Sequence, residues 1–138
     1  MSDIYILDAC AVIAFLSKEP GGTEVYALLR RAEREEIKLF MHNLNLLEVY
    51  YGLRRAHGEA SSRTRLDYLT HLPINFLSEI VGEPFIEAGR LKASYKISLA
   101  DAILVSEASI LGATVVTTDH HELDAVEKVE PTQFYWIR

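Results

Sequence analysis

Short strand-like segments alternate with helical segments along this chain, and the first pair is the clearest. Ile4 to Leu7 is a run of β-branched, aromatic and aliphatic residues, which is typical of a buried strand. From Ala9 to Leu16 the apolar residues recur at helical spacing, until the segment 18–22, Lys-Glu-Pro-Gly-Gly, ends the pattern. Asp8 therefore lies at the carboxyl end of a strand and at the start of a helix. In open α/β sheets this edge is where ligands bind.

The same alternation continues to the C-terminus. Further helices are predicted over 22–36, 44–53, 59–72, 83–96 and 99–111, the last closed by Gly112. Further strands are predicted over 37–41, 74–77, 114–118 and 133–137. Strands that alternate with helices form a parallel sheet with helices on both faces. We therefore predict an α/β fold, a three-layer α/β/α sandwich around a short, mostly parallel central sheet.

Size and composition limit the remaining choices. The chain has 138 residues, of which 49% are hydrophobic and 25% charged, so we expect a single globular domain over residues 1–138. Its apolar runs are far shorter than the roughly 20 residues that span a bilayer, and its start does not resemble a signal peptide. Cys10 is the only cysteine, which excludes an internal disulfide. The expected location is the cytoplasm, without membrane association.

The net charge of −6 argues against indiscriminate nucleic-acid binding, which needs a basic surface. That average hides two basic segments. Residues 54–65 contain four arginines and one acid, and residues 90–96 contain three basic residues and no acid. Such clusters are either solvated helix faces or a rim that contacts phosphate. Charge alone does not distinguish the two interpretations.

Four isolated carboxylates are the main candidates for chemistry. Asp8 stands alone in its apolar segment, and Glu48 and Asp101 are each the only charge in an otherwise uncharged stretch. Asp119 follows the predicted strand 114–118. Each lies near a strand's carboxyl end or in the first turn of a helix, and in a parallel sheet these places fall on one edge. Four acids from distant parts of the chain are therefore expected to converge.

Helix capping is the alternative explanation for these acids. Three segments have the spacing of a capping box, namely Asn45-x-x-Glu48, Ser98-x-x-Asp101 and Asp119-x-x-Glu122, and Asp8 is placed to cap the helix after it. Glu48 and Asp101, however, lie in helices that otherwise look buried, with no Lys or Arg in those runs. The two explanations are compatible, because a helix N-terminus favours an ionised carboxylate.

A cluster of four acids needs compensation. Two carboxylates about 4 Å apart repel by roughly 4 kcal/mol at an effective dielectric constant of about 20. Either protonation or a cation must offset this repulsion. Oxygen-only ligands suit Mg²⁺ or Mn²⁺ rather than zinc. Such an ion polarises a phosphodiester and lowers the pKa of an attacking water.

The motifs around these acids, in this order and spacing, resemble those of PIN-domain ribonucleases, most closely the toxin of a VapBC-type toxin–antitoxin pair. The motifs are residues 6–16 (ILDACAVIAFL), 45–53 (NLLEVYYGL), 99–102 (LADA) and 117–119 (TTD). The resemblance implies that Asp8, Glu48, Asp101 and Asp119 form a catalytic, metal-binding site. It also implies that the Thr117 hydroxyl contacts the ligand carboxylates without binding the ion itself. Asn45 is a weaker candidate for the same role.

One stretch departs from the family pattern. After Asp119 the family often has a small turn and an aromatic residue, whereas this chain has residues 120–123, His-His-Glu-Leu. The geometry around the fourth acid is therefore the least determined by the resemblance. Adjacent residues on a helix do not face one target, so His120 and His121 are interpreted as surface residues.

The resemblance implies a Mg²⁺- or Mn²⁺-dependent endoribonuclease that leaves a 5′-phosphate and a 3′-hydroxyl. It further implies a homodimer that is silenced by an antitoxin protein, as in a type II toxin–antitoxin pair. RNA is the expected substrate, with Arg54 and Arg55 as candidates to neutralise its phosphates. Tyr50 and Tyr51 are candidates for base contacts, although packing or a dimer surface explains them more simply.

Three other functions share part of this pattern. Haloacid-dehalogenase-like phosphatases need a second Asp two residues after the nucleophile, where this chain has Cys10, itself most simply a small core residue. A receiver domain needs a Lys after a late strand, and residues 113–119 contain none. The third is a non-toxin or catalytically silent PIN-like module that acts in RNA processing or partner binding. Sequence cannot show turnover, so this alternative stays open.

Overall fold

Five parallel strands form the centre of the molecule, in the spatial order β3-β2-β1-β4-β5. The computed structural model describes residues 3–138. The strands are β1 (Ile4–Leu7), β2 (Lys38–His42), β3 (Asn75–Leu77), β4 (Thr114–Thr117) and β5 (Phe134–Trp136). The predicted α/β fold with a parallel sheet is confirmed, and all strand pairings are parallel.

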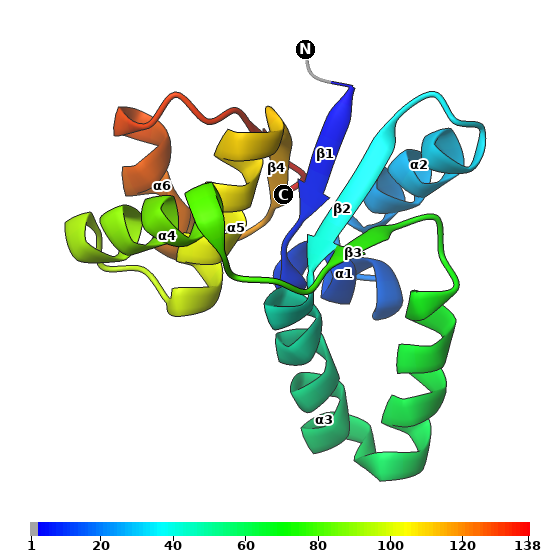
Figure 1. Cartoon of the computed structure of the whole chain (residues 1–138). Helices are drawn as coiled ribbons and strands as arrows, with labels where there is room; N and C mark the ends of the chain where they lie inside the picture. The colour runs from blue at the N-terminus through cyan, green and yellow to red at the C-terminus, as the bar shows by residue number, and fades with distance from the viewer. Residues whose placement is uncertain (1–2) are drawn as a thin grey trace.

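The helices are α1 (Ala9–Leu16), α2 (Gly22–Glu33), α3 (Asn43–Thr70), α4 (Gly82–Ser94), α5 (Leu99–Leu111) and α6 (His120–Val129). They form layers on the two faces of the sheet, with α1 and α2 on one side and α4, α5 and α6 on the other (Figure 1). Alternate residues of β1 pack on opposite faces of the sheet, because successive side chains of a strand point in opposite directions. Leu7 packs with α1 and α2, whereas Ile6 packs with α5.

The central elements are buried on nearly all sides. All four residues of β4 are buried, as expected for a strand covered by helices on both faces. In α5 the whole run 101–108 is buried, which agrees with its strongly apolar sequence. This helix ends at Gly112, whose φ of 67° is a left-handed conformation that glycine adopts without strain.

The two helices predicted over 44–53 and 59–72 are present as the two arms of α3, with slightly different bounds. The arms are separated at Gly58, where φ is 81° and ψ is 178°. Only glycine adopts this combination readily, so the chain bends sharply there and the second arm of α3 returns toward the sheet (Figure 1). The predicted helix over 22–36 also ends early, because Glu35 takes a left-handed φ of 63°.

Helix α6 is the element that the sequence pattern did not predict. It is short, and only Leu123 and Val126 of its ten residues are buried. Two buried apolar residues in a charged segment give a weak helical signal. The missed helix matters for the site, because it starts directly after Asp119.

Three helices start where a strand ends, at the same edge of the sheet. Helix α1 follows β1, α3 follows β2, and α6 follows β4. Their first turns therefore meet at the carboxyl ends of adjacent parallel strands. Within residues 3–138, no helix is both long enough and apolar enough to cross a lipid bilayer.

Candidate active site

Asp8 is held by hydrogen bonds to both carboxylate oxygens. It caps α1, with Oδ1 accepting a hydrogen bond from the Ala11 backbone N–H at 2.7 Å. Oδ2 accepts a hydrogen bond from the Thr117 hydroxyl at the end of β4. Only 2% of Asp8 is exposed to solvent. The capping role predicted for Asp8 is thus confirmed, and the same carboxylate also lines a pocket at the sheet edge.

Thr117 also fixes the backbone next to Asp119. The Asp119 N–H donates to the Thr117 hydroxyl oxygen at 2.9 Å. Asp119 in turn caps α6, with Oδ1 accepting from the Glu122 N–H at 3.2 Å. One buried hydroxyl thus contacts the acid at the end of β1 and the backbone of the acid after β4.

The other two capping predictions have different outcomes. Ser98 caps α5, with its hydroxyl accepting from the Asp101 N–H at 3.1 Å, so this capping spacing is real. The capping box predicted for Asn45 and Glu48 is wrong, because α3 starts earlier. His42 is its cap, and Nδ1 of this buried ring accepts from the Leu44 N–H at 3.0 Å.

Four separate elements bring the predicted acids around one pocket of about 150 Å³ at this edge. Its lining residues are Asp8, Ala9, Cys10, Glu48, Ser98, Asp101, Asp119 and Glu122. None of these carries a positive charge. Asn45 does not line the pocket; it is buried in the first turn of α3, without a hydrogen-bond partner for its amide among residues 3–138.

Burial and repulsion between carboxylates raise the pKa values of Asp8, Glu48 and Asp101 in this pocket. Burial is the main cause for Asp8, whose pKa rises to about 7, although hydrogen bonds from Thr117 and Ala11 oppose the rise. Burial likewise raises the pKa of Glu48, and the charges of Glu122 and Asp119 add to the effect. The site thus binds protons unless a cation takes their place.

Glu122 is the site residue that sequence analysis missed. Its Oε2 accepts a hydrogen bond from the Ser98 N–H at 3.1 Å. Burial is the main cause of the raised pKa of Asp101, and a hydrogen bond with the Glu122 carboxylate raises it further while lowering the pKa of Glu122. The signal was present in the spacing Asp119-x-x-Glu122. That spacing gave Glu122 only a capping role, and it does not show that the side chain lies against Ser98 and Asp101.

The donor set fits a hard divalent cation. Asp101, Asp119 and Glu122 each offer one carboxylate oxygen, and these oxygens lie within 4.8 Å of one another. An all-carboxylate set suits Mg²⁺ or Mn²⁺. Cys10 lines the pocket rather than only the core, but burial and the nearby carboxylates raise the pKa of its thiol to about 12. A protonated thiol is a poor ligand and a poor nucleophile.

A family model described as "PIN domain" matches residues 5–129. The chain belongs to the PIN domain family. This PIN domain resembles solved structures over nearly its whole length. The DNA-bound VapBC of Salmonella typhimurium matches with a TM-score of 0.74 and 15% identity, over 100% of both chains. VapBC2 of Rickettsia felis bound to a promoter DNA fragment has a TM-score of 0.72 and 17% identity, over 96% of this chain and 97% of that one.

A third structure similar to this PIN domain is VapBC-1 of nontypeable Haemophilus influenzae. It matches with a TM-score of 0.69 and 17% identity, over 97% of this chain and 98% of that one. A sequence search of curated proteins gives no significant match. At these identities the similarity shows a shared fold.

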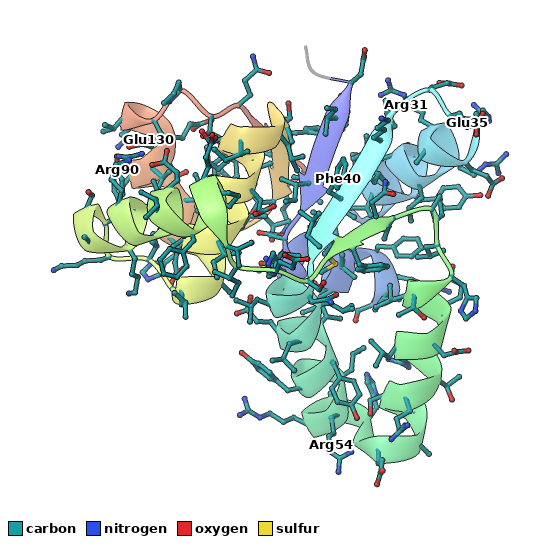
Figure 2. All side chains as sticks on the ribbon, in the orientation of Figure 1. Arg31, Glu35, Phe40, Arg54, Arg90 and Glu130 are labelled. Atoms are coloured by element: carbon teal, nitrogen blue, oxygen red, sulfur yellow. The ribbon has the colours of Figure 1, made fainter. Side chains whose placement is uncertain are left out.

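The basic segment 90–96 of this PIN domain serves its own packing. Arg90 donates to Glu130 at 2.6 Å and to Glu87 at 2.5 Å, and Figure 2 shows Arg90 and Glu130 facing each other between α4 and α6. Glu130 also accepts from the Tyr95 hydroxyl at 2.5 Å. Lys92 donates to the Ile97 carbonyl at 2.7 Å. These contacts favour a structural role over a phosphate-binding rim for this segment.

The histidines after Asp119 are exposed, as predicted. His120 stacks on Trp136 with ring centroids 4.0 Å apart and forms a hydrogen bond with Asp124 at 2.9 Å. His121 is also exposed. Neither lines the acidic pocket.

Proposed function

We propose that this PIN domain is a Mg²⁺- or Mn²⁺-dependent endoribonuclease and the toxin of a type II toxin–antitoxin pair. The observation that carries the proposal is the pocket at the sheet edge, where acids that follow β1 and β4 meet acids of α3, α5 and α6, with no cationic side chain among the lining residues. Five acids in so small a space stay ionised together only with a divalent cation. The proposal treats residues 1–138 as one nuclease domain.

The side chains divide into distinct roles in this proposal. Asp101, Asp119 and Glu122 hold the ion, because their oxygens lie closest together. Asp8 completes the site, and the Thr117 hydroxyl fixes its orientation. Glu48 also lines the pocket and is less buried than Asp8, so we assign its carboxylate to orienting the attacking water. When bound, the ion supplies Lewis-acid polarisation of the phosphodiester and a lowered pKa for that water.

The expected products, by resemblance to PIN-domain ribonucleases, carry a 5′-phosphate and a 3′-hydroxyl. In-line attack at phosphorus by a water produces such ends when the 3′-oxygen leaves. The acids hold the reacting groups in place. Carboxyl groups that carry a proton must lose it before they bind an ion. Protons compete with the ion for these oxygens, and the pKa of Asp8 in the metal-free protein is about 7, so cleavage at limiting Mn²⁺ is expected to fall as the pH drops below this value.

A protein partner is part of the proposal. The three similar structures named above are VapBC assemblies, and two of them are bound to DNA. The start of α4 and the loop before it expose the apolar residues Ile80, Val81, Phe85 and Ile86. Contiguous exposed apolar surface is typical of protein interfaces. We infer a homodimer in the cytoplasm, with an antitoxin protein that blocks the acidic pocket.

Cleavage of purified RNA tests the enzymatic part of the proposal. The wild-type protein is expected to cut a pool of total tRNA and rRNA in the presence of Mn²⁺, and chelation is expected to abolish the cutting. Asp8→Asn should reduce the rate at least about 100-fold, by losing a charge at the ion. Lys18→Gln, remote from the pocket, is the control. Undiminished cleavage by Asp8→Asn, or in excess chelator, would refute the proposal.

Co-expression tests the toxin assignment separately. Induction of the wild-type chain should arrest growth, and induction of Asp8→Asn should not. A small DNA-binding protein encoded immediately upstream should relieve the arrest. If Mn²⁺ binds to the acids but neither cleavage nor growth arrest is found, the chain is a catalytically silent PIN module.

A further inference from the structure

One face of the first arm of α3 begins at Glu48 in the acidic pocket and continues along the helix away from it. A helix turns by about 100° and rises about 1.5 Å per residue. Arg55 is therefore within about 20° of Glu48 around the axis of α3 and about 10 Å farther along it. Gly52 and Tyr51 lie between them, within about 40° and 60° of Glu48. Arg54 lies about 120° away, on a different side of the helix.

Tyr51 and Arg55 form an exposed pair on this face. The Arg55 guanidinium lies over the Tyr51 ring, 5.0 Å from its centroid, and 43% of Tyr51 is exposed. Within residues 3–138, no carboxylate lies in ion-pair distance of Arg55. Its charge is therefore available to an anionic ligand.

Arg54 differs from its neighbour in this respect. Its guanidinium is 3.8 Å from the Glu59 carboxylate. Figure 2 shows Arg54 near the far end of α3, where the helix turns back. From sequence both arginines were candidates for phosphate contact. In the structure their surroundings differ, and only Arg55 lies on the same face of α3 as Glu48.

Gly52 has no evident structural reason to be glycine. It lies within the first arm of α3, and a Cβ built there would have no atom within 4 Å. Glycine inside a helix costs roughly 0.5–1 kcal/mol relative to alanine. Neither packing nor a positive φ accounts for that cost here. The missing side chain instead leaves open space beside the helix backbone, between Glu48 and Arg55.

We propose that Tyr51, Gly52 and Arg55 form a track that holds the RNA strand on one side of the scissile phosphate. In this track Tyr51 stacks on an unpaired base, Arg55 contacts a phosphate, and Gly52 gives the strand room to pass close to α3. The inference rests on the proposed ribonuclease function and adds to it a positioning site outside the metal pocket. Stacking of a base on an aromatic ring is worth about 1–3 kcal/mol and requires an unpaired base, so the track favours single-stranded RNA.

Binding and turnover of a single-stranded RNA oligonucleotide test the track. Arg55→Gln and Tyr51→Ala should each raise KM about tenfold, with kcat within about twofold and Mn²⁺ affinity unchanged, because they contact substrate away from the reacting phosphate. Arg55→Gln should also reduce the salt slope of RNA binding by about 0.7, the value for one contact to a single strand. Arg34→Gln removes an exposed charge directly after α2 and should change none of these values.

Gly52→Ala gives the sharpest test, because its two effects have opposite signs. The variant should melt at a higher temperature, since alanine favours the helix, yet bind the oligonucleotide at least about threefold more weakly. A purely structural role for Gly52 predicts only the rise in melting temperature. A higher melting temperature without weaker RNA binding would therefore contradict the track.

Fluorescence anisotropy with Asp8→Asn and labelled RNA separates the failure of this inference from failure of the proposed function. If the wild type does not cleave but RNA affinity still depends on Tyr51 and Arg55, the track is supported and the nuclease proposal fails. If the wild type cleaves and these substitutions change KM no more than Arg34→Gln does, the track is refuted. The track is also refuted if Tyr51→Ala changes the molar mass of the protein in solution but leaves its RNA affinity unchanged. Tyr51 would then be a contact between protein subunits.

Discussion

The hydroxyl of Thr117 donates a hydrogen bond to the Asp8 carboxylate and so joins the carboxyl ends of the two central strands, β1 and β4. The same oxygen accepts from the Asp119 N–H at 2.9 Å. Because Thr117 is fully buried, water cannot replace either bond readily. One side chain thus sets the positions of two acids that are far apart in sequence.

Thr117→Val should damage the site while keeping the shape of the residue. The variant leaves the Asp119 N–H unpaired and removes the bond that lowers the pKa of Asp8. We expect a loss of about 1–3 kcal/mol in the free energy of unfolding and roughly tenfold weaker Mn²⁺ binding. Thr117→Ser keeps the hydroxyl and should retain most of the Mn²⁺ affinity. Denaturation and calorimetric titration measure both quantities, and equal Mn²⁺ affinities for the two variants would contradict this role.

The metal-free protein should become more stable as the pH falls from about 8 to about 5. Asp8 has a pKa of about 7 in the folded state and an ordinary value of 3.8. Between these values the folded chain binds a proton that the unfolded chain does not, so lowering the pH increases the free energy of unfolding. The raised pKa of Glu48 acts in the same direction. Melting temperatures in chelator across this range measure the effect.

Asp8→Asn is the matched variant for that pH dependence. Asn keeps a side-chain oxygen that can cap α1 but carries no charge to bury. We therefore expect it to exceed the wild type in metal-free stability at pH 8, by about 1–3 kcal/mol, with the difference shrinking toward pH 5. If Asp8→Asn is less stable than the wild type at pH 8, burial of the Asp8 charge is not the dominant unfavourable contribution of this residue to folding.

Much of the fold followed from sequence because its signals were local and strong. The run 99–111 is apolar enough to predict a buried helix with the bounds that α5 has. Asp8, Glu48 and Asp101 stood out because each is a lone charge in such surroundings. A parallel sheet then places the ends of its strands on one edge, and this placed the acids together.

The remainder depended on contacts that sequence spacing does not encode. His42 caps α3 through a ring nitrogen, which a search for Asp, Asn, Ser or Thr caps overlooks. Gly58 separates the two arms of α3 as the sequence pattern indicates, but the pattern does not show that the chain reverses direction there. Glu122 looked like one more surface acid, because only the packing of α6 against α5 directs it toward Ser98 and Asp101.

Mn²⁺ should stabilise the protein strongly at pH 8 and weakly at pH 5.5, because protons compete with the ion for the same oxygens. At a concentration about 100 times Kd, a ligand adds about 2.7 kcal/mol to the free energy of unfolding. Asp124→Asn removes an exposed acid of α6 that pairs with His120, and it should leave this shift unchanged. A shift of equal size at both pH values would indicate binding to other groups.

Glu122→Gln tests the acid that sequence analysis missed. Gln keeps an oxygen that can accept from the Ser98 N–H, so α5 and α6 should stay in place and the melting temperature should change little. The loss of charge should weaken Mn²⁺ binding at least about tenfold at pH 7.5, and excess Mn²⁺ should restore part of the RNA cleavage. It should also lower the pKa of Asp101, because the negative charge of Glu122 contributes to raising it. If Glu122→Gln binds Mn²⁺ as tightly as the wild type does, Glu122 only holds Ser98 in place. The other four acids then bind the ion.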